Sequence, residues 1–226
     1  MARPSADRTR AVAARAPGLQ LGERQARAMI MQGAATTFAE LGLRAASVED
    51  ILNAAGVSRR TFYRLYGSKE DVALELYRLG TKFLLDACEM AVREEKDPIR
   101  QFERCIDAHL GNARQFGRLV FVLGGEAQRQ ESPLHARRMQ VHDSIVELLR
   151  TSTAKANRAL EHADPLLFRM LLLSIESIVR ILLEEGDEGR NVSDASLARA
   201  RRVMVRVLTA TLDGTGPRVT PMPTVE

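Results

Sequence analysis

The sequence is poor in aromatic residues and in turn-forming residues. Its 226 residues include no tryptophan, three tyrosines, seven phenylalanines and only eight prolines. Strands of sandwiches and barrels favour aromatic and β-branched side chains, with turn residues at short intervals. The composition therefore argues against a many-stranded β fold. Alanine, leucine, arginine and glutamate dominate instead, and because these residues are strong helix formers we expect an all-α protein.

Cysteine and long apolar runs are also scarce. The only two cysteines, Cys88 and Cys105, are too few for a disulfide framework, which leaves two buried free thiols or a redox sensor. No signal peptide is recognisable near the N-terminus, where Arg15 and Pro17 interrupt the only apolar stretch. Uncharged apolar-dominated runs, such as the one between Arg169 and Glu176, are far shorter than the ~20 residues of a membrane span. We expect a soluble cytoplasmic protein without a membrane partner.

Motifs of catalysis and metal binding are absent too. The sequence has no G-x-S-x-G, no phosphate loop, no H-E-x-x-H and no C-x-x-C. Its four histidines are scattered, and His135 and His142 stand two helical turns apart, too far for a pair on one metal. We therefore expect no enzyme activity, no metal and no cofactor.

Positive charge is concentrated in the N-terminal third. The whole chain has 33 basic and 29 acidic residues, a net charge of +4. Residues 1–69 contain 11 basic and 5 acidic residues, a balance of +6, whereas residues 70–226 contain 22 and 24, a balance of −2. A local basic excess suggests a polyanionic partner, either nucleic acid or an anionic membrane.

Helix boundaries are clearly marked. A capping side chain directly precedes a proline at 97–98, 132–133 and 164–165, the preferred arrangement for the first two positions of a helix. Ser47 and Ser68 are each followed three residues later by aspartate, which resembles a capping box. These signals predict nine helices, at residues 23–41, 48–55, 59–66, 69–95, 98–116, 118–130, 133–160, 165–185 and 194–213.

Two short helices joined by a glycine turn stand out in the basic third. Residues 48–55 carry apolar side chains at positions i, i+3, i+4 and i+7, which gives a two-turn helix one apolar face. Gly56 permits a sharp turn, and Ser58 caps the second helix. On that second helix, Phe62 and Tyr66 face the core. The pattern predicts a helix-turn-helix.

The second helix exposes cationic and hydroxyl side chains on its other faces. They are Arg59, Arg60, Thr61, Tyr63 and Arg64. Arginine can donate a bidentate pair to guanine, a contact worth about 1–3 kcal/mol of discrimination. Ser47 and Lys69 stand at the starts of flanking helices, where backbone N–H groups favour a phosphate. This arrangement favours DNA over an anionic membrane.

Residues 24–77 closely resemble the DNA-binding domain of the TetR family of bacterial transcriptional regulators. The matching elements are Phe38-Ala-Glu-Leu-Gly42, Ser47-Val-x-Asp-Ile51, Ala55-Gly-Val-Ser58, Thr61-Phe-Tyr63 and Ser68-Lys-Glu70. The sequence departs from the family pattern in two places. Leu65-Tyr66 replaces the commoner aromatic residue or histidine followed by phenylalanine, and Arg60 stands where glycine is frequent. The resemblance implies operator contacts from Arg44, Ser47, Arg59, Arg60, Thr61, Tyr63, Arg64 and Lys69.

The last two predicted helices suit an interface between two copies of the chain. Residues 164–185 are apolar around nearly the whole helix circumference, so this helix must be buried on more than one side. The resemblance implies the same arrangement, a four-helix interface in a homodimer. The expected interface residues are Leu167, Met170, Leu171, Ile178, Ile181, Leu197, Met204, Val207, Leu208 and Thr211.

The remaining helices would enclose an effector cavity if the family pattern holds. Apolar and polar side chains of residues 98–170 could line it, although each is also a candidate for plain core packing. The candidates are Phe102, His109, Phe116, Phe121, Met139, His142, Phe168 and Met170.

The domain organisation expected from these signals has four parts. They are a disordered basic arm (1–20), a helix-turn-helix domain (22–82), an effector-binding and dimerisation domain (83–213) and a disordered tail (214–226). The resemblance implies a homodimeric repressor that a small-molecule effector releases from a palindromic double-stranded operator. The alternatives are a constitutive DNA-binding regulator or architectural protein without an effector, an enzyme that borrowed the N-terminal domain, and a protein whose basic face binds an anionic membrane.

Overall fold

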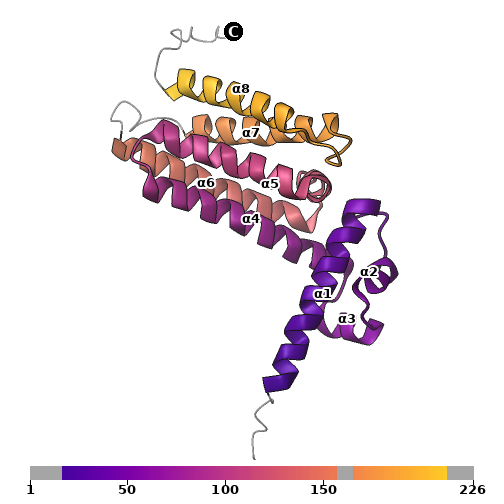
Figure 1. The fold of residues 1–226 in the computed structure, drawn as a ribbon. Helices are drawn as coiled ribbons and strands as arrows, with labels where there is room; N and C mark the ends of the chain where they lie inside the picture. The colour runs from indigo at the N-terminus through magenta and orange to yellow at the C-terminus, as the bar shows by residue number, and fades with distance from the viewer. Residues whose placement is uncertain (1–16, 157–164, 213–226) are drawn as a thin grey trace, which may run out of the picture.

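The computed structural model describes residues 17–156 and 165–212, and every regular element in these ranges is an α-helix (Figure 1). The all-α prediction is therefore confirmed. None of these helices is long and apolar enough to cross a membrane. The helices are α1 (Pro17–Leu41), α2 (Val48–Ala55), α3 (Arg59–Leu65), α4 (Lys69–Glu94), α5 (Pro98–Ala127), α6 (Pro133–Ala156), α7 (Pro165–Glu185) and α8 (Asp194–Leu212).

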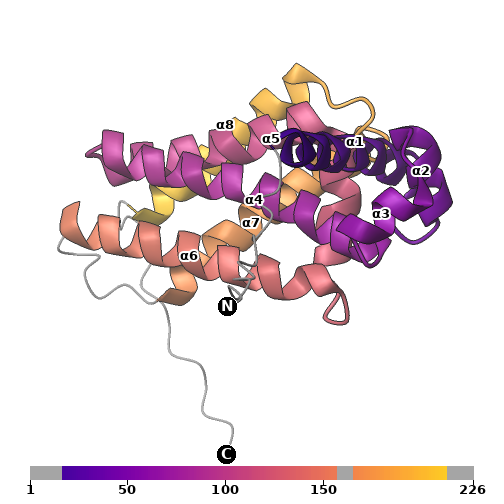
Figure 2. The same ribbon diagram turned by 90° about the horizontal axis from the view of Figure 1, so that it is seen from below.

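The helices form two groups, which we call the head (α1–α3) and the body (α4–α8). Figures 1 and 2 show the head gathered at one end of the molecule, with the body helices stacked beside it. Helix α4 starts at the head and runs along the body, and α8 lies on the far side of the body from α4 (Figure 1).

Two predicted helix boundaries are wrong. Helix α5 is one continuous helix of 30 residues, where the sequence predicted a break at Gly117. Glycine weakens a helix but does not end one that is packed against neighbours, and Gly117 is buried where another segment comes close. Helix α1 begins at Pro17, ahead of the predicted residue 23. The predicted tail, and the predicted arm as far as residue 16, lie outside the described residues.

The core of the head is completed by residues of the body. Phe38 and Phe62 of the head are fully buried. Leu123 and Ala127 of α5 and Leu134 of α6 are buried in the same hydrophobic cluster. The head is therefore packed onto the end of the body rather than tethered to it by α4 alone.

The body has its own core. Phe102 of α5 and Phe168 of α7 stack with their ring centroids 6.1 Å apart, which joins these two helices. Cys88 and Cys105 are both buried free thiols in this core, in agreement with the first of the two alternatives that the sequence left open.

Gly117 marks a close backbone contact between α5 and the loop that precedes α8. A methyl group added at Gly117 would lie 2.3 Å from the carbonyl oxygen of Gly189, far closer than two such atoms can approach. Gly189 itself has a φ of +89°, which favours glycine. This contact explains why the helix keeps a glycine at Gly117.

We expect Gly117→Ala to lower the free energy of unfolding by about 1–3 kcal/mol, because α5 or the loop must move to relieve the overlap. Gly111→Ala on the same helix is the matched control, since no atom of the described residues beyond its own helix turn lies within 4 Å of the added methyl group. The control should be unchanged, or more stable by up to ~1 kcal/mol from helix propensity. Urea unfolding of both variants measures the difference, and equal effects would contradict the contact.

Candidate functional site

The turn between α2 and α3 has the geometry that the sequence predicts. The Ser47 hydroxyl accepts a hydrogen bond from the Asp50 N–H at 3.1 Å, and the Asp50 carboxylate accepts one from the Ser47 N–H at 2.8 Å. This capping box lowers the pKa of the Asp50 carboxyl through its hydrogen bonds from the Ser47 hydroxyl and N–H. At the other end of α2, Gly56 has a φ of 63° and donates its N–H to the Leu52 carbonyl at 2.9 Å. Helix α2 therefore ends sharply and the chain turns into α3.

Helix α3 is anchored on one face and exposed on the others. Ser58 caps the helix by accepting a hydrogen bond from the Thr61 N–H at 3.1 Å. Phe62 and Tyr66 are buried in the head core. A short helix held in this way presents its remaining side chains in a fixed orientation, as a recognition helix requires. Its exposed side chains are Arg59, Arg60, Tyr63 and Arg64.

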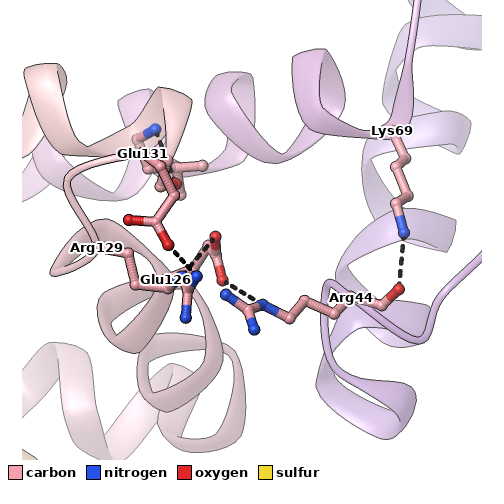
Figure 3. Close-up of polar contacts among 7 residues, drawn as sticks. Arg44, Lys69, Glu126, Arg129 and Glu131 are labelled. Carbon is pink, nitrogen blue, oxygen red and sulfur yellow. Dashed lines mark hydrogen bonds and ion pairs between the residues drawn. The ribbon is translucent and has the colours of Figure 1, made fainter.

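Two of the predicted DNA-contacting cations also make structural contacts, one within the head and one between the head and α4. Arg59 Nη2 donates to Glu49 Oε2 at 2.7 Å, which ties α3 to α2. Lys69 Nζ donates to the carbonyl oxygens of Arg44 at 3.0 Å and Ala46 at 2.5 Å. Lys69 therefore holds the loop before α2 against the start of α4 (Figure 3). Sequence reasoning missed both contacts.

Arg44 connects this loop to the body. Its Nε lies 3.4 Å from Glu126 Oε2 at the end of α5, and Glu126 also lies 3.8 Å from Arg129 Nε (Figure 3). The side chain of Arg44 is 63% exposed whereas that of Glu126 is 17% exposed. The arginine can therefore exchange this carboxylate for another anion without losing buried packing.

A cavity of about 220 Å³ lies in the body between α4, α5, α6 and α7. Its walls are mainly apolar. Leu79, Phe83 and Phe116 line it and are also exposed, so they stand at its mouth. Because a mostly apolar cavity with a few polar groups is the usual form of a small-molecule site, it is the candidate ligand site of this chain.

A polar cluster forms part of the cavity wall. Glu176 Oε2 accepts from Arg138 Nη2 at 2.6 Å, and Glu176 Oε1 lies 2.5 Å from His142 Nε2. Burial acts to raise the pKa of the Glu176 carboxyl, but His142 and Arg138 outweigh it and hold that pKa below its usual value. Among the residues that the structure describes, no group of three or more histidine, cysteine or acidic side chains is placed to hold a metal ion.

The structure brings together half of the predicted effector-pocket residues. His109, Phe116, Phe121 and His142 line the cavity. The other four do not. Phe102 and Phe168 stack on each other in the body core, and Met139 and Met170 are outside the lining. Sequence reasoning missed the wall that α4 supplies through Tyr77 and its neighbours, and it missed Arg138 and Glu176.

The predicted dimer residues also divide into two groups. Four of them are buried in the protomer's own core and cannot form a partner surface: Leu171, Leu197, Met204 and Leu208. Met170, Ile181 and Val207 are exposed, and Leu167, Ile178 and Thr211 are half-buried. Sequence reasoning missed three further exposed apolar side chains on the same two helices, Leu166, Leu173 and Val203.

A capped helix-turn-helix with an exposed basic second helix, packed onto an all-helical body, is the arrangement of helix-turn-helix DNA-binding proteins. Residues 30–76 match the family model described as bacterial regulatory proteins, tetR family. This segment of the chain is thus similar to the DNA-binding domain of the TetR family. The matching family model describes regulatory proteins and not enzymes, in line with the expectation from the sequence.

Comparison with known proteins gives relatives of the same kind. The HTH-type transcriptional repressor KstR2 of Mycobacterium tuberculosis is 30% identical over 106 residues, which cover 47% of this chain and 53% of the relative. The chain thus spans about half the length of the curated relatives it matches.

Solved structures share the fold over most of the chain. PfmR of Thermus thermophilus, a TetR family regulator, is 24% identical with a TM-score of 0.63, covering 83% of this chain and 99% of that one. FadR of Bacillus subtilis, solved in complex with stearoyl-CoA, is 18% identical with a TM-score of 0.67, covering 80% of this chain and 96% of that one. Identities this low show the common fold alone.

His109 makes the stability of the body depend on pH. Its ring is buried, and burial lowers the pKa of His109 below the usual 6.5 although Nδ1 lies 2.8 Å from the Cys105 carbonyl oxygen. Below about pH 6.5 the unfolded chain therefore binds a proton at this histidine that the folded chain does not bind. Stability must fall as the pH drops through that range.

We expect the free energy of unfolding of the wild type to decrease from pH 7 to pH 5, with His109 contributing up to ~1.4 kcal/mol per pH unit. His109→Gln removes that contribution, so its stability should fall less steeply over the same range. Urea unfolding at several pH values measures both slopes. Parallel curves for the two proteins would contradict a neutral buried His109.

Proposed function

We propose that this protein is a sequence-specific DNA-binding regulator, a homodimeric repressor that leaves a palindromic operator when a small molecule occupies the body cavity. The observation that carries the proposal is α3, which exposes three guanidinium groups while Phe62 anchors it in the head core. The naming of the M. tuberculosis relative as a repressor supports the direction of regulation.

The roles of the head residues follow from their positions. Arg59 and Arg60, at the start of α3, would reach base edges in the major groove. The pair with Glu49 orients Arg59, and because a guanidinium has five N–H donors it leaves others for a base. Thr61 and Tyr63 would contact phosphates or a thymine methyl. Phosphate contacts would come from Arg44, Ser47, Arg64 and Lys69.

The homodimer would form through the exposed apolar side chains of α7 and α8. Leu166, Leu167 and Met170 belong to an apolar groove along α7. Val203 and Val207 are also exposed, on α8, which packs against α7. Exposed apolar side chains on neighbouring helices favour an interaction site there. Two copies joined there would hold two heads for the two halves of a palindrome.

Release by an effector is supported by contacts of α5, which contributes residues both to the cavity lining and to the head core. Leu123 lines the cavity and is also buried in the head core. Arg118, on the same helix, donates from Nε to the Ala39 carbonyl of α1 at 2.9 Å. A ligand that shifts α5 would therefore shift the head. Because both heads of a dimer must fit the DNA together, a small shift is enough to lower operator affinity.

We expect Arg60→Ala to lower the ratio of operator to random-DNA affinity by about tenfold, because one base contact is worth about 1–3 kcal/mol. Lys69→Ala should weaken binding to both DNAs and reduce the salt slope by about one, because it removes a phosphate contact. The matched control is Arg93→Ala, which removes one exposed charge from the end of α4 away from the head.

Fluorescence anisotropy at several salt concentrations, on an operator selected from random DNA, measures these effects. Arg93→Ala should leave both the ratio and the slope unchanged. The assignment of roles would fail if Arg60→Ala reduced the affinity for both DNAs equally.

We expect Met170→Glu to dissociate the homodimer, because a charge on the exposed α7 face would be buried without a partner. Met90→Glu on α4 is the matched control, since Met170 is 48% exposed and Met90 is 46% exposed. Light scattering after gel filtration gives the mass of each. A Met170→Glu protein that remains dimeric would show that the copies associate elsewhere.

A further inference from the structure

His142, one of the residues that line the cavity, has a ring nitrogen without a hydrogen-bond partner among the described residues. His142 is 2% exposed, and this nitrogen, Nδ1, is buried. An unsatisfied buried polar atom of this kind carries a free-energy cost that a bound partner would remove. It differs from His109, whose Nδ1 lies 2.8 Å from the Cys105 carbonyl oxygen.

The contacts of His142 define what Nδ1 can accept. The ionised Glu176 carboxylate only accepts hydrogen bonds, so His142 Nε2 must carry the hydrogen that points to it at 2.5 Å. Arg138 already balances the charge of Glu176 at 2.6 Å. With Nε2 committed to Glu176, Nδ1 is the ring nitrogen left to accept a hydrogen bond. The matching ligand group is a hydrogen-bond donor.

Within the described part of the chain, no unpaired cation faces the cavity to receive an anionic ligand. Arg138 is paired with Glu176 as described. Arg180, the other arginine of the lining, lies 3.0 Å from Glu184 and stacks over the Phe121 ring at 5.0 Å. A carboxylate or phosphate that entered the cavity would lose its water without gaining a free counter-charge. The lining therefore favours an uncharged ligand.

The size and the mouth of the cavity set the shape of the ligand. An apolar cavity of about 150 Å³ holds benzene, so about 220 Å³ holds a somewhat larger molecule. The exposed side chains of Leu79, Phe83 and Phe116 surround the opening. An apolar chain at this end would remain in contact with apolar side chains as it leaves the cavity.

We propose that the cavity binds a small uncharged amphiphile with a hydroxyl at its buried end, of the kind that an alkylphenol represents. The hydroxyl donates to His142 Nδ1, the ring fills the apolar cavity and the alkyl chain points to the mouth. This identification rests on the proposed function of the cavity as the effector site, and it adds the chemical class of the effector.

The test compares three probes of one shape on the full-length protein: 4-propylphenol, propylbenzene and 4-propylbenzoate. Isothermal titration calorimetry should give 4-propylphenol at least about tenfold tighter binding than either of the others, because only its neutral hydroxyl satisfies Nδ1. Equal affinity for the phenol and propylbenzene, tightest binding of the benzoate, or no binding of the phenol would overturn the proposal.

Two substitutions test whether His142 is the source of the tighter binding of the phenol. His142→Leu should remove the preference of the phenol over propylbenzene, whereas His135→Leu, a change outside the cavity lining on the same helix, should keep it. A preference that survives His142→Leu in a folded protein would overturn the proposal. If that variant does not fold, the ¹⁵N shift of His142 Nδ1 in the wild type decides, because it must change when 4-propylphenol binds and stay unchanged with propylbenzene.

Operator release is measured separately, so the two proposals can fail independently. Binding of 4-propylphenol with the expected preference but without loss of operator affinity would support the ligand class and contradict release by the cavity. Release by a larger or charged ligand, with no binding of the phenol, would support the proposed function and overturn the ligand class.

Discussion

The structure depends on one packing constraint: the head cannot bury its core without the body. Helices α2 and α3 are only two turns long, and with α1 they leave apolar side chains that need further cover. Leu123 and Ala127 of α5 and Leu134 of α6 supply that cover. Every movement of these two body helices therefore changes the packing of the helix-turn-helix. A protein built in this way needs no separate hinge to connect its two parts.

Polar contacts reinforce the same junction. Arg118 donates to the Ala39 carbonyl, and Arg44 lies against Glu126 at the end of α5. Glu126 directly follows Gly124 and Gly125, which line the cavity. Arg44 is also a proposed phosphate contact, so the carboxylate of Glu126 would compete with DNA for this guanidinium. A ligand in the cavity and DNA at Arg44 would thus act on neighbouring residues at the end of α5, which gives the proposed coupling a physical route.

The helix-turn-helix was predictable because its signals are local. Ser47, Gly56 and Ser58 each determine the geometry of one helix end, and their structures match the prediction. The break predicted at Gly117 was wrong because that glycine serves a contact with Gly189, far away in the sequence. The α4 wall of the cavity and the Glu176 cluster were missed for the same reason, since they exist only once distant helices pack together. On α7 and α8, periodicity identified apolar stripes but could not separate buried from exposed positions.

The claim that the head borrows part of its core from the body is tested most directly by amide hydrogen exchange. Leu134 and Leu149 are both buried leucines of α6, but Leu134 belongs to the head cluster and Leu149 to the body cluster. Each Leu→Ala substitution should lower the free energy of unfolding by about 2–5 kcal/mol. Leu134→Ala should increase exchange in α1 and α2, while Leu149→Ala should leave these helices protected to the wild-type degree. Unchanged protection of α1 and α2 in Leu134→Ala would contradict the account.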